Sequence, residues 1–592
     1  MRDPLTEDER LARAGIEGRV AFVAAALFLS GSLLVVIDRV GAPARLVATL
    51  GPAIAMGGLV ALGFLVQAMR IANFYAAGRI MPAKYVGLAL AGLAAALIPP
   101  MLPPGPPGGL HAAMLAGLAA GVALAGFGSG PLLRKSGAFS LPDLFGVRFE
   151  SPALRSASAV VVAAACGLVA LAGFDGAVRS LQEALGLERF SSAALVGFIV
   201  LAVVAPGGLA GSAWAAAVAA FVLSLALLMP IVMLLAGGSP LPAPYAGRAD
   251  LWAEALSHMA LWNPSPNQPP VAAVAVAVAV AIGVAALSPL LSPMIACRTA
   301  RTSSRAGVVG LGWFLVLAAA MLTGMAISVL SLDALVVGKR PDALPPFIYL
   351  ASDKGLLSIC GQFVGAPRAA AVACSAVEGF PGQLDVENLW ASGRYFLTGL
   401  PELGRFSLAM SALVSAGYLA AALALAAAGV QACATALGHD LVSAARGRPA
   451  LTSRRLAASR LVMIGLCLAL AYLASGSLHT PQNLLALAVL IAASALAPLL
   501  LLTAWSRATA ADAALTFAAG VCAAAATAAL AWRDHAFVTP VMASGALAGF
   551  AVASLAGYAT SLRRKESETR PGRIFVEGLL YGDGEVMGAD RI

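Results

Sequence analysis

Long apolar runs alternate with short polar segments along almost the whole chain. A bilayer-spanning α-helix needs about 20 apolar residues, because each residue adds about 1.5 Å along the helix axis. Fourteen runs approach this length, and we predict that each is a transmembrane helix. They are residues 20–37, 46–68, 85–103, 112–133, 157–174, 192–210, 213–237, 270–296, 307–331, 406–438, 456–475, 482–504, 513–531 and 539–561. The pattern therefore predicts an all-α polytopic membrane protein.

The composition supports the same class of protein. Hydrophobic residues make up 60% of the 592 residues and charged residues only 11%, against about 25% charged in soluble proteins. So few charges cannot cover the surfaces of the several soluble domains that a chain of this length would otherwise form. We expect a lipid bilayer around the chain, with a polar leader at residues 1–19 and a polar tail at residues 562–592 on the cytoplasmic side.

The Lys and Arg residues of the loops indicate the orientation. Fourteen spans place both termini on one side, and the loops on that side carry more than twice as many Lys and Arg residues as the short loops opposite. By the positive-inside rule, both termini are then cytoplasmic and the chain lies in the cell (inner) membrane. The long 332–405 segment lies outside. The net charge of +9 follows from these loops and forms no basic stripe, so we expect no nucleic-acid partner.

The chain has no residue spacing typical of a metal or catalytic site. The seven cysteines form no CxxC pair and the five histidines lie far apart, so we expect no metal centre and no cofactor. No nucleophile, base and orienting group gather near one another, which disfavours an enzyme. Cys360 and Cys374 both fall in the 332–405 segment, where they form either a disulfide or two free thiols.

Polar side chains are rare inside the predicted spans. Arg460 is the only charged residue there, and it is near the cytoplasmic end of its span, where we expect it to snorkel toward water. Span 406–438 carries Ser411, Ser415 and Tyr418 on or near one face. These three residues are candidates for lining a solute cavity, and the alternative is hydrogen bonding between neighbouring helices.

Four segments carry short motifs in a recognisable order. They are NFYAAGR at 73–79 with GLALAG at 87–92, LRKSGAFSLPD at 133–143 with Arg148-Phe149, Gly207-Gly208 with Trp214, and GHDL at 438–441. Together they resemble the sodium:solute symporter family, in particular its acetate and monocarboxylate permease branch. The second segment, which contains Arg134, Asp143 and Arg148, resembles the family's cytoplasmic loop most closely.

The resemblance implies a core of ten helices in two inverted five-helix repeats. The first repeat would cover residues 85–237 and the second residues 270–504, including the external loop 332–405. Two accessory helices at residues 20–68 would precede the core, and two at residues 513–561 would follow it. A solute would bind between the repeats near the middle of the membrane, where the first and sixth core helices break.

The resemblance also implies where a sodium ion would bind. Backbone carbonyls of the first core helix and hydroxyls of the eighth hold the ion in the family, and the carbonyl positions fall at Gly92 and Ala95. The hydroxyl positions fall at Ala424 and Leu425, whose side chains contain no oxygen. A hard cation takes several oxygen ligands, so we expect transport to be sodium-independent or only weakly sodium-dependent.

These observations predict a secondary active transporter that moves a small organic solute, such as the monocarboxylate acetate, across the cell membrane by alternating access. Arg134, Asp143 and Arg148 would have a structural and gating role, with Asp143 paired to a nearby base, and would not bind solute. The alternative is a relative without transport activity that serves as a membrane sensor or accessory subunit. The sequence leaves the oligomeric state open.

Overall fold

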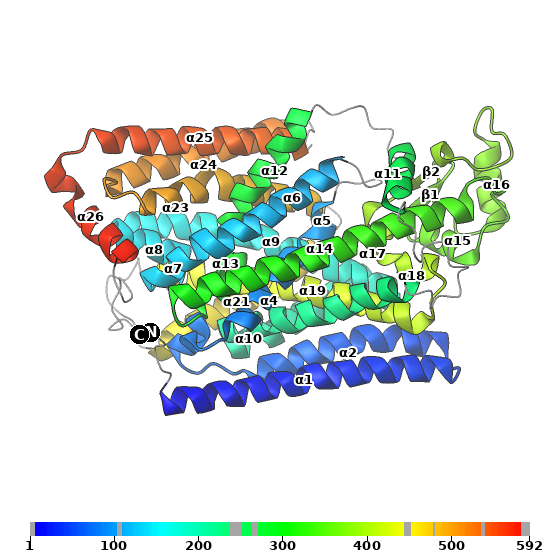
Figure 1. Cartoon of the computed structure of the whole chain (residues 1–592), viewed down its shortest axis with the longest axis horizontal. Helices are drawn as coiled ribbons and strands as arrows, with labels where there is room; N and C mark the ends of the chain where they lie inside the picture. The colour runs from blue at the N-terminus through cyan, green and yellow to red at the C-terminus, as the bar shows by residue number, and fades with distance from the viewer. Residues whose placement is uncertain are drawn as a thin grey trace.

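A computed structural model describes residues 6–102, 109–235, 251–262, 270–442, 452–476, 480–533 and 539–581. Most of these residues are helical, and the long helices run side by side along the long axis of the molecule (Figure 1). Twelve described helices are long and apolar enough to cross a membrane, or thirteen if the bent pair α12 (Pro270–Ala285) and α13 (Ser288–Ile295) forms one span. The chain is therefore an all-α multi-pass membrane protein, as predicted.

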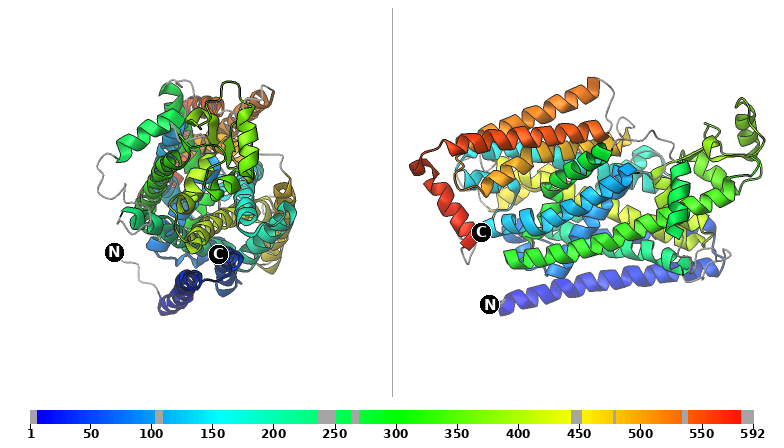
Figure 2. Two further views of the ribbon diagram at one scale, coloured as in Figure 1. Left: turned by 90° about the vertical axis from the view of Figure 1, so that its right-hand side faces the viewer. Right: turned by 45° about the horizontal axis from the view of Figure 1, so that its top comes forward.

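Two long helices precede the core and lie along one side of the bundle (Figures 1 and 2). The first begins with a capping box, in which the side chains of Thr6 and Glu9 each accept the other's backbone N–H. Most of the predicted polar leader is therefore a helical extension of the first span. The N-terminal elements are α1 (Glu7–Arg39), α2 (Ala44–Leu65), α3 (Ile71–Ala76) and the single turn η1 (Ala77–Arg79).

The first half of the core contains four long helices, two of them connected by short helices. Its elements are α4 (Ala83–Ala96), α5 (Ile98–Met101), α6 (Gly109–Leu124), η2 (Ala125–Ser129), α7 (Gly130–Ser136), α8 (Leu141–Arg148), α9 (Pro152–Leu185) and α10 (Arg189–Leu235). Ser140 caps α8 by accepting the backbone N–H of Asp143 at 3.1 Å, which fixes the start of this helix next to the core.

The helix α10 folds back on itself at Gly208. Its 47 residues would be about 70 Å long if straight, more than twice the thickness of the hydrocarbon core. Gly208 has φ 55° and ψ −137°, a conformation open to glycine, and a Cβ added to Gly211 would lie only 2.6 Å from the carbonyl oxygen of Val203. If α10 crosses the membrane twice and the bent pair once, the count becomes the predicted fourteen, which stays a prediction.

Arg460 stabilises this break rather than snorkelling to water. Its guanidinium donates to the carbonyl oxygens of Ala205 at 3.0 Å and Ala68 at 3.3 Å, and it lies over the ring of Phe74. The helical donor for the carbonyl of Ala205 would be the N–H of Leu209, which lies beyond the break at Gly208, so this carbonyl needs another donor. The expectation of a snorkelling side chain was wrong because the helix break provides acceptors within reach.

The second half of the core and the outer segment follow. Their elements are α11 (Leu251–Trp262), α12, α13, α14 (Ala300–Val336), α15 (Pro346–Asp353), β1 (Leu357–Ile359), α16 (Pro367–Ser375), η3 (Val386–Asn388), β2 (Leu389–Ala391), α17 (Gly393–Thr398), α18 (Leu400–Leu403), α19 (Leu408–Thr435), η4 (Ala436–Leu441), α21 (Thr452–Ser475), α22 (Pro481–Ile491), η5 (Ala492–Leu496) and α23 (Ala497–Thr503). The strands β1 and β2 pair antiparallel, with Ser358 opposite Trp390.

Three helices complete the chain, and they are α24 (Ala510–Arg533), α25 (Thr539–Leu562) and α26 (Glu566–Tyr581). The predicted polar tail therefore contains a helix. Figure 1 shows α26 at the same end of the bundle as the start of α1, while β1, β2, α15 and α16 lie at the opposite end. An ion pair of 2.7 Å between Glu9 and Arg298 joins the start of α1 to the loop after α13. We call these two ends the inner and the outer end.

Two glycines bring core helices into backbone contact. A Cβ added to Gly126 of η2 would lie 2.7 Å from the Cα atom of Gly307 in α14, and one added to Gly307 would lie 2.5 Å from the carbonyl oxygen of Gly126. Small residues of this kind let membrane helices pack closely where lipid provides no hydrophobic driving force.

Cys360 and Cys374 form a disulfide in the outer segment. The sequence left open a disulfide or two free thiols, and the structure contains the disulfide. The bond joins the end of β1 to α16 across 14 residues. A disulfide requires an oxidising compartment, so the finding agrees with an outer end outside the cytoplasm.

We expect the double variant Cys360→Ser with Cys374→Ser to destabilise the outer segment. Closing a loop of 14 residues stabilises a fold by about 3 kcal/mol. The measurement is the rate of limited proteolysis of the intact protein within residues 339–385, which should rise in the double variant and in reduced wild type. Cys522→Ser, which removes an exposed free thiol, is the control. Free thiols at both positions in non-reducing mass spectrometry would contradict the pairing.

Candidate functional site

A cavity of about 660 Å³ enters the bundle from the outer end. It is bordered by α4, α5, α9, α10, α14 and α19, together with the outer segment and the start of α22. At the outer end it reaches exposed residues such as Lys354, and at the inner end it stops against buried residues such as Leu425. Its shape is that of a binding site open to one side of the membrane.

The inner wall of the cavity is apolar and made of small side chains. Ala95, Gly173, Ala421 and Ala422 line it, and their lack of bulk leaves the space open. Tyr418 is the largest polar side chain on this wall, and its hydroxyl points to the carbonyl oxygen of Leu397 at 3.5 Å. A solute in this part of the cavity would contact mostly hydrocarbon.

Backbone carbonyls add polarity where the side chains have none. The carbonyls of Ala95 and Ala96 would each receive an N–H four residues later in a regular helix, but those positions are Pro99 and Pro100. Proline has no N–H, so neither carbonyl has its usual helical donor. All four residues line the cavity.

Four cationic side chains line the cavity toward its outer end, and we call them the basic rim. They are Arg179, Arg189, Lys354 and Arg394. Asp175 pairs with Arg179 at 2.7 Å and also with Arg189. Glu183 pairs with Arg394 at 3.1 Å, and its backbone carbonyl accepts from Lys354. Glu402 also interacts with Lys354, and four cations against three carboxylates leave a net positive charge that favours anions.

The sequence did not predict the basic rim, for a physical reason. Two of its members lie near the facing ends of α9 and α10, and two lie in the outer segment far along the chain. The one relevant signal in the sequence is the i, i+4 spacing of Asp175 and Arg179, which allows an ion pair on one helix face.

The predicted cavity and cation residues divide into two groups. Ala95, Tyr418 and Leu425 line the cavity. Gly92, Ala424, Ser411 and Ser415 are not among its lining residues. Gly92 instead packs against α10, where an added Cβ would lie 2.6 Å from the Cβ of Ala220. The sodium positions implied by the resemblance therefore have little oxygen to offer from side chains.

The inner end is closed by a network around Asp143. Arg155 of α9 lies 2.8 Å from Asp143 of α8 and 2.9 Å from Asp440 of η4, so the expected ion pair of Asp143 is present. Ser140 donates to Asp440 at 2.6 Å. The ring of His439 lies against Tyr75 and Phe139, with centroid distances of 4.8 and 5.7 Å. This plug joins α3, α8, α9 and η4.

Arg134 and Arg148, the other predicted loop residues, bind backbone carbonyls. Arg134 donates to the carbonyl oxygens of Cys297 and Arg298 after α13. Arg148 donates to those of Thr503 at 3.0 Å and Trp505 at 2.8 Å, and its burial lowers the pKa of its guanidinium to about 10. Both arginines hold segments of the inner end together, far from the cavity lining.

The plug does not favour a metal ion. Metal ions in proteins are held by His, Cys, Asp and Glu side chains. Among the described residues, one group of three such side chains has ligand atoms within 4.8 Å of one another, and it consists of Asp143, His439 and Asp440. Arg155 already pairs with both carboxylates, so a metal would have to displace a cation that is held in place.

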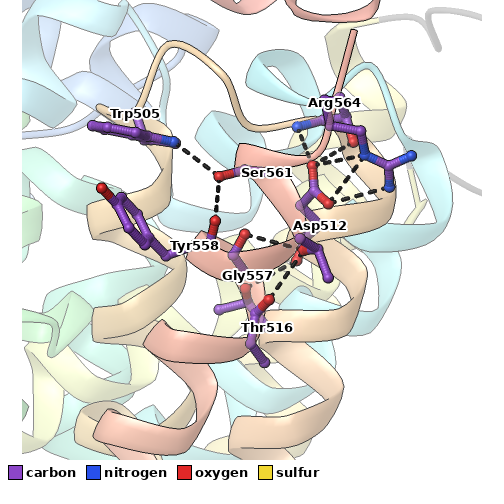
Figure 3. Close-up of polar contacts among 10 residues, drawn as sticks. Trp505, Asp512, Thr516, Gly557, Tyr558, Ser561 and Arg564 are labelled. Carbon is purple, nitrogen blue, oxygen red and sulfur yellow. Dashed lines mark hydrogen bonds and ion pairs between the residues drawn. The ribbon is translucent and has the colours of Figure 1, made fainter.

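A separate network holds the C-terminal helices at the inner end (Figure 3). Arg564 lies 3.1 Å from Asp512, which also accepts the hydroxyl of Thr509 at 2.7 Å. Trp505 donates its indole N–H to Ser561 at 3.0 Å. These contacts join α24 and α25 to the end of α23, and none of the residues lines the cavity, so the network is structural.

Comparison with known proteins identifies the fold. The model of the sodium:solute symporter family matches residues 74–344. Among solved structures, the substrate-bound, outward-open state of a Na⁺-coupled sialic acid symporter has a TM-score of 0.62 at 13% identity, and the match covers 87% of this chain and 97% of that chain. The chain shares the fold of this symporter. No curated protein matches it in sequence.

Two further solved structures match with TM-scores too low to extend this conclusion. One is a nucleobase-cation-symport-1 family transporter in a closed conformation, with a TM-score of 0.36, 15% identity, and coverage of 87% and 95%. The other is the Eremococcus coleocola manganese transporter, with a TM-score of 0.39, 15% identity, and coverage of 88% and 92%. The proteins that match are transporters and not enzymes.

Proposed function

We propose that this chain is a secondary active transporter that moves a small organic anion by alternating access. The observation that carries the proposal is the cavity, which is open at the outer end and closed below by the plug of α3, α8, α9 and η4. A transporter of this kind binds its solute from one side while the other side is closed. The fold shared with an outward-open symporter supports the same interpretation.

The lining of the cavity favours a short monocarboxylate such as acetate. The basic rim attracts and orients an anionic group, while the inner wall of Ala, Gly and Leu suits a short hydrocarbon chain. The wall offers few polar groups that would hold a sugar or an amino acid.

We further propose that the core consists of two inverted repeats, residues 85–237 and 270–504. The packing supports this arrangement, because the first helix of each repeat packs against the other repeat: α4 against α14, and α12 against α6. An operation that exchanges the two repeats places α4 on α12 and α14 on α6, so it turns one of these helix pairs into the other. The accessory helices at 20–68 and 513–561 then lie outside the repeats.

We propose an inner-membrane location with cytoplasmic termini. The excess of Lys and Arg in the inner loops and the disulfide at the outer end support this orientation independently.

Uptake into proteoliposomes tests the proposed function. Purified protein should accumulate one or more labelled short-chain carboxylates under an imposed ion gradient, and excess unlabelled solute should compete. Empty liposomes are the control. Absence of uptake for every solute and gradient would contradict the proposed transport function. The alternative, a membrane sensor or accessory subunit, would then remain.

We predict that uptake changes little when sodium is replaced by choline at fixed pH. The hydroxyl positions implied by the resemblance are Ala424 and Leu425, so few ligands remain to replace the hydration shell of the ion. Initial uptake rates in the two media are the measurement. The double variant Ala424→Ser with Leu425→Ser should gain sodium stimulation, whereas the same pair of hydroxyls at Ala427 and Ala428 should not. Many-fold stimulation of wild type would contradict the prediction.

A further inference from the structure

Two buried carboxylates of the plug, those of Asp143 and Asp440, are paired with a single shared cation. Four aspartates are buried among the described residues. Asp175 pairs with two arginines, and Asp512 pairs with Arg564 and accepts from Thr509. Asp143 and Asp440 instead share one guanidinium, that of Arg155.

Hydrogen bonds to the two carboxylates do not remove this imbalance. Ser140 donates to Asp440, and the backbone N–H of Phe139 donates to Asp143 at 3.2 Å. Both donors are neutral. A net negative charge in a site closed to water is costly, and proteins avoid it by pairing the charge or by taking up a proton.

His439 is placed to take part in such a proton site. Only 5% of the surface of His439 is exposed. Its Nδ1 atom has no hydrogen-bond partner among the described residues. A ring nitrogen lies within 4.8 Å of the carboxylate oxygens of Asp143 and Asp440. A buried imidazole with an unpaired nitrogen can share a proton with carboxylates that lie this close.

The other groups facing the imidazole come from its own element and four others. They are Asp440 on its own element, Asp143 of α8, Arg155 of α9, Arg455 of α21 and Tyr75 of α3. Arg455 forms no ion pair with either carboxylate in the described part of the chain. Tyr75 is neutral, and burial raises the pKa of its hydroxyl. Among the described residues, Arg155 is therefore the only cation that forms an ion pair with these two aspartates.

We propose that Asp143, His439 and Asp440 bind one proton while the inner end is closed and release it when the inner end opens. The inference rests on the proposed alternating-access function, because it assumes that the plug opens. Opening separates Tyr75 from His439 and Ser140 from Asp440 and admits water. Hydrated carboxylates hold a proton far less tightly at neutral pH, so the open form releases it.

The direction of the pH effect follows from linkage. A proton that binds the closed form more tightly stabilises that form, so acid on the inner side keeps the plug closed and alkali favours opening. For one linked proton, the ratio of open to closed molecules changes by up to about tenfold per pH unit between the pKa values of the two forms.

Distances between spin labels test the proposal without any solute. The labels are placed at Met69→Cys, which precedes α3, and Ala457→Cys of α21, in full-length protein whose exposed Cys522 is replaced by serine. Pulsed electron paramagnetic resonance in lipid nanodiscs gives the distance distribution between about pH 5 and about pH 9. We expect a longer distance to become more populated as the pH rises.

Three variants assign the effect to the plug. Asp440→Asn removes the excess charge and should abolish the pH dependence. His439→Gln should shift the dependence to lower pH, because a carboxylate must then take the proton. Asp512→Asn changes a buried aspartate of the separate C-terminal network and should keep the wild-type profile.

A wild-type distance distribution that does not change with pH would overturn the proposal, whatever the variants do. So would an unchanged pH profile in Asp440→Asn. If the variant does not fold, the wild-type titration still decides. Failure of the transport proposal is seen separately, because it appears as absent solute uptake with a pH response that remains.

Discussion

Replacing Arg155 by alanine is expected to remove most of the folded protein. In the described structure Arg155 alone pairs with Asp143 and Asp440, and both carboxylates are buried. Breaking a buried ion pair from one side typically costs about 3–5 kcal/mol, because an uncompensated charge stays behind. This is a large part of the total stability of a protein, about 5–15 kcal/mol. The yield of purified protein and its unfolding temperature in detergent should both fall.

Arg179→Ala is the matched control for this loss. It also removes an arginine from a buried aspartate, but Asp175 keeps its pair with Arg189, and Arg179 is 40% exposed. Its cost should stay within about 0–1 kcal/mol. Arg155→Lys retains the charge and should fall between the two. Equal unfolding temperatures for Arg155→Ala and Arg179→Ala would show that the plug does not depend on its cation.

Replacing Ala422 by tryptophan is expected to abolish uptake without unfolding the protein. Ala422 lines the cavity between α9 and α19 and is partly exposed to it, so an indole has room there only at the expense of the solute. One added methylene in a fitted pocket already changes discrimination by about 10–200-fold. The much larger indole should lower initial uptake in proteoliposomes by at least about 100-fold.

Leu468→Trp carries the same side chain on the outside of the bundle. Leu468 is 68% exposed on α21, where lipid surrounds the helix, so uptake and abundance should stay near wild type. Wild-type uptake by Ala422→Trp at normal abundance would place the solute somewhere other than this cavity.

The helices could be predicted from the sequence because lipid imposes a length on every apolar run. The runs that became α1, α9 and α14 were predicted too short, since helices continue into water once capping or outer contacts stabilise them. The α15–α18 region was only a polar segment in the sequence. Its two-stranded sheet depends on pairing between Leu357 and Ala391, which are far apart in the chain.

The site could be predicted only where neighbours in space are also close in sequence or follow a motif. Asp143 was expected to find a base, but the identity of Arg155 as a base shared with Asp440 depends on the packing of α9 against η4. Ala95, Tyr418 and Leu425 were named from the sequence and line the cavity. The basic rim and the rest of the wall were not predicted, since Ala and Gly at a cavity wall look the same as Ala and Gly between packed helices.

Ala95 and Ala96 line the cavity, and their carbonyls lack the helical donors that Pro99 and Pro100 cannot supply, so main-chain oxygens are available for its chemistry. Truncating each lining side chain in turn would leave both oxygens where they are, so a mutational scan would report this wall as inert. The role of these oxygens can instead be tested by replacing the prolines. Pro99→Ala would return an N–H to the carbonyl of Ala95 and draw that oxygen back into the helix. Ligand contacts made through backbone oxygens would be insensitive to substitution of the surrounding side chains.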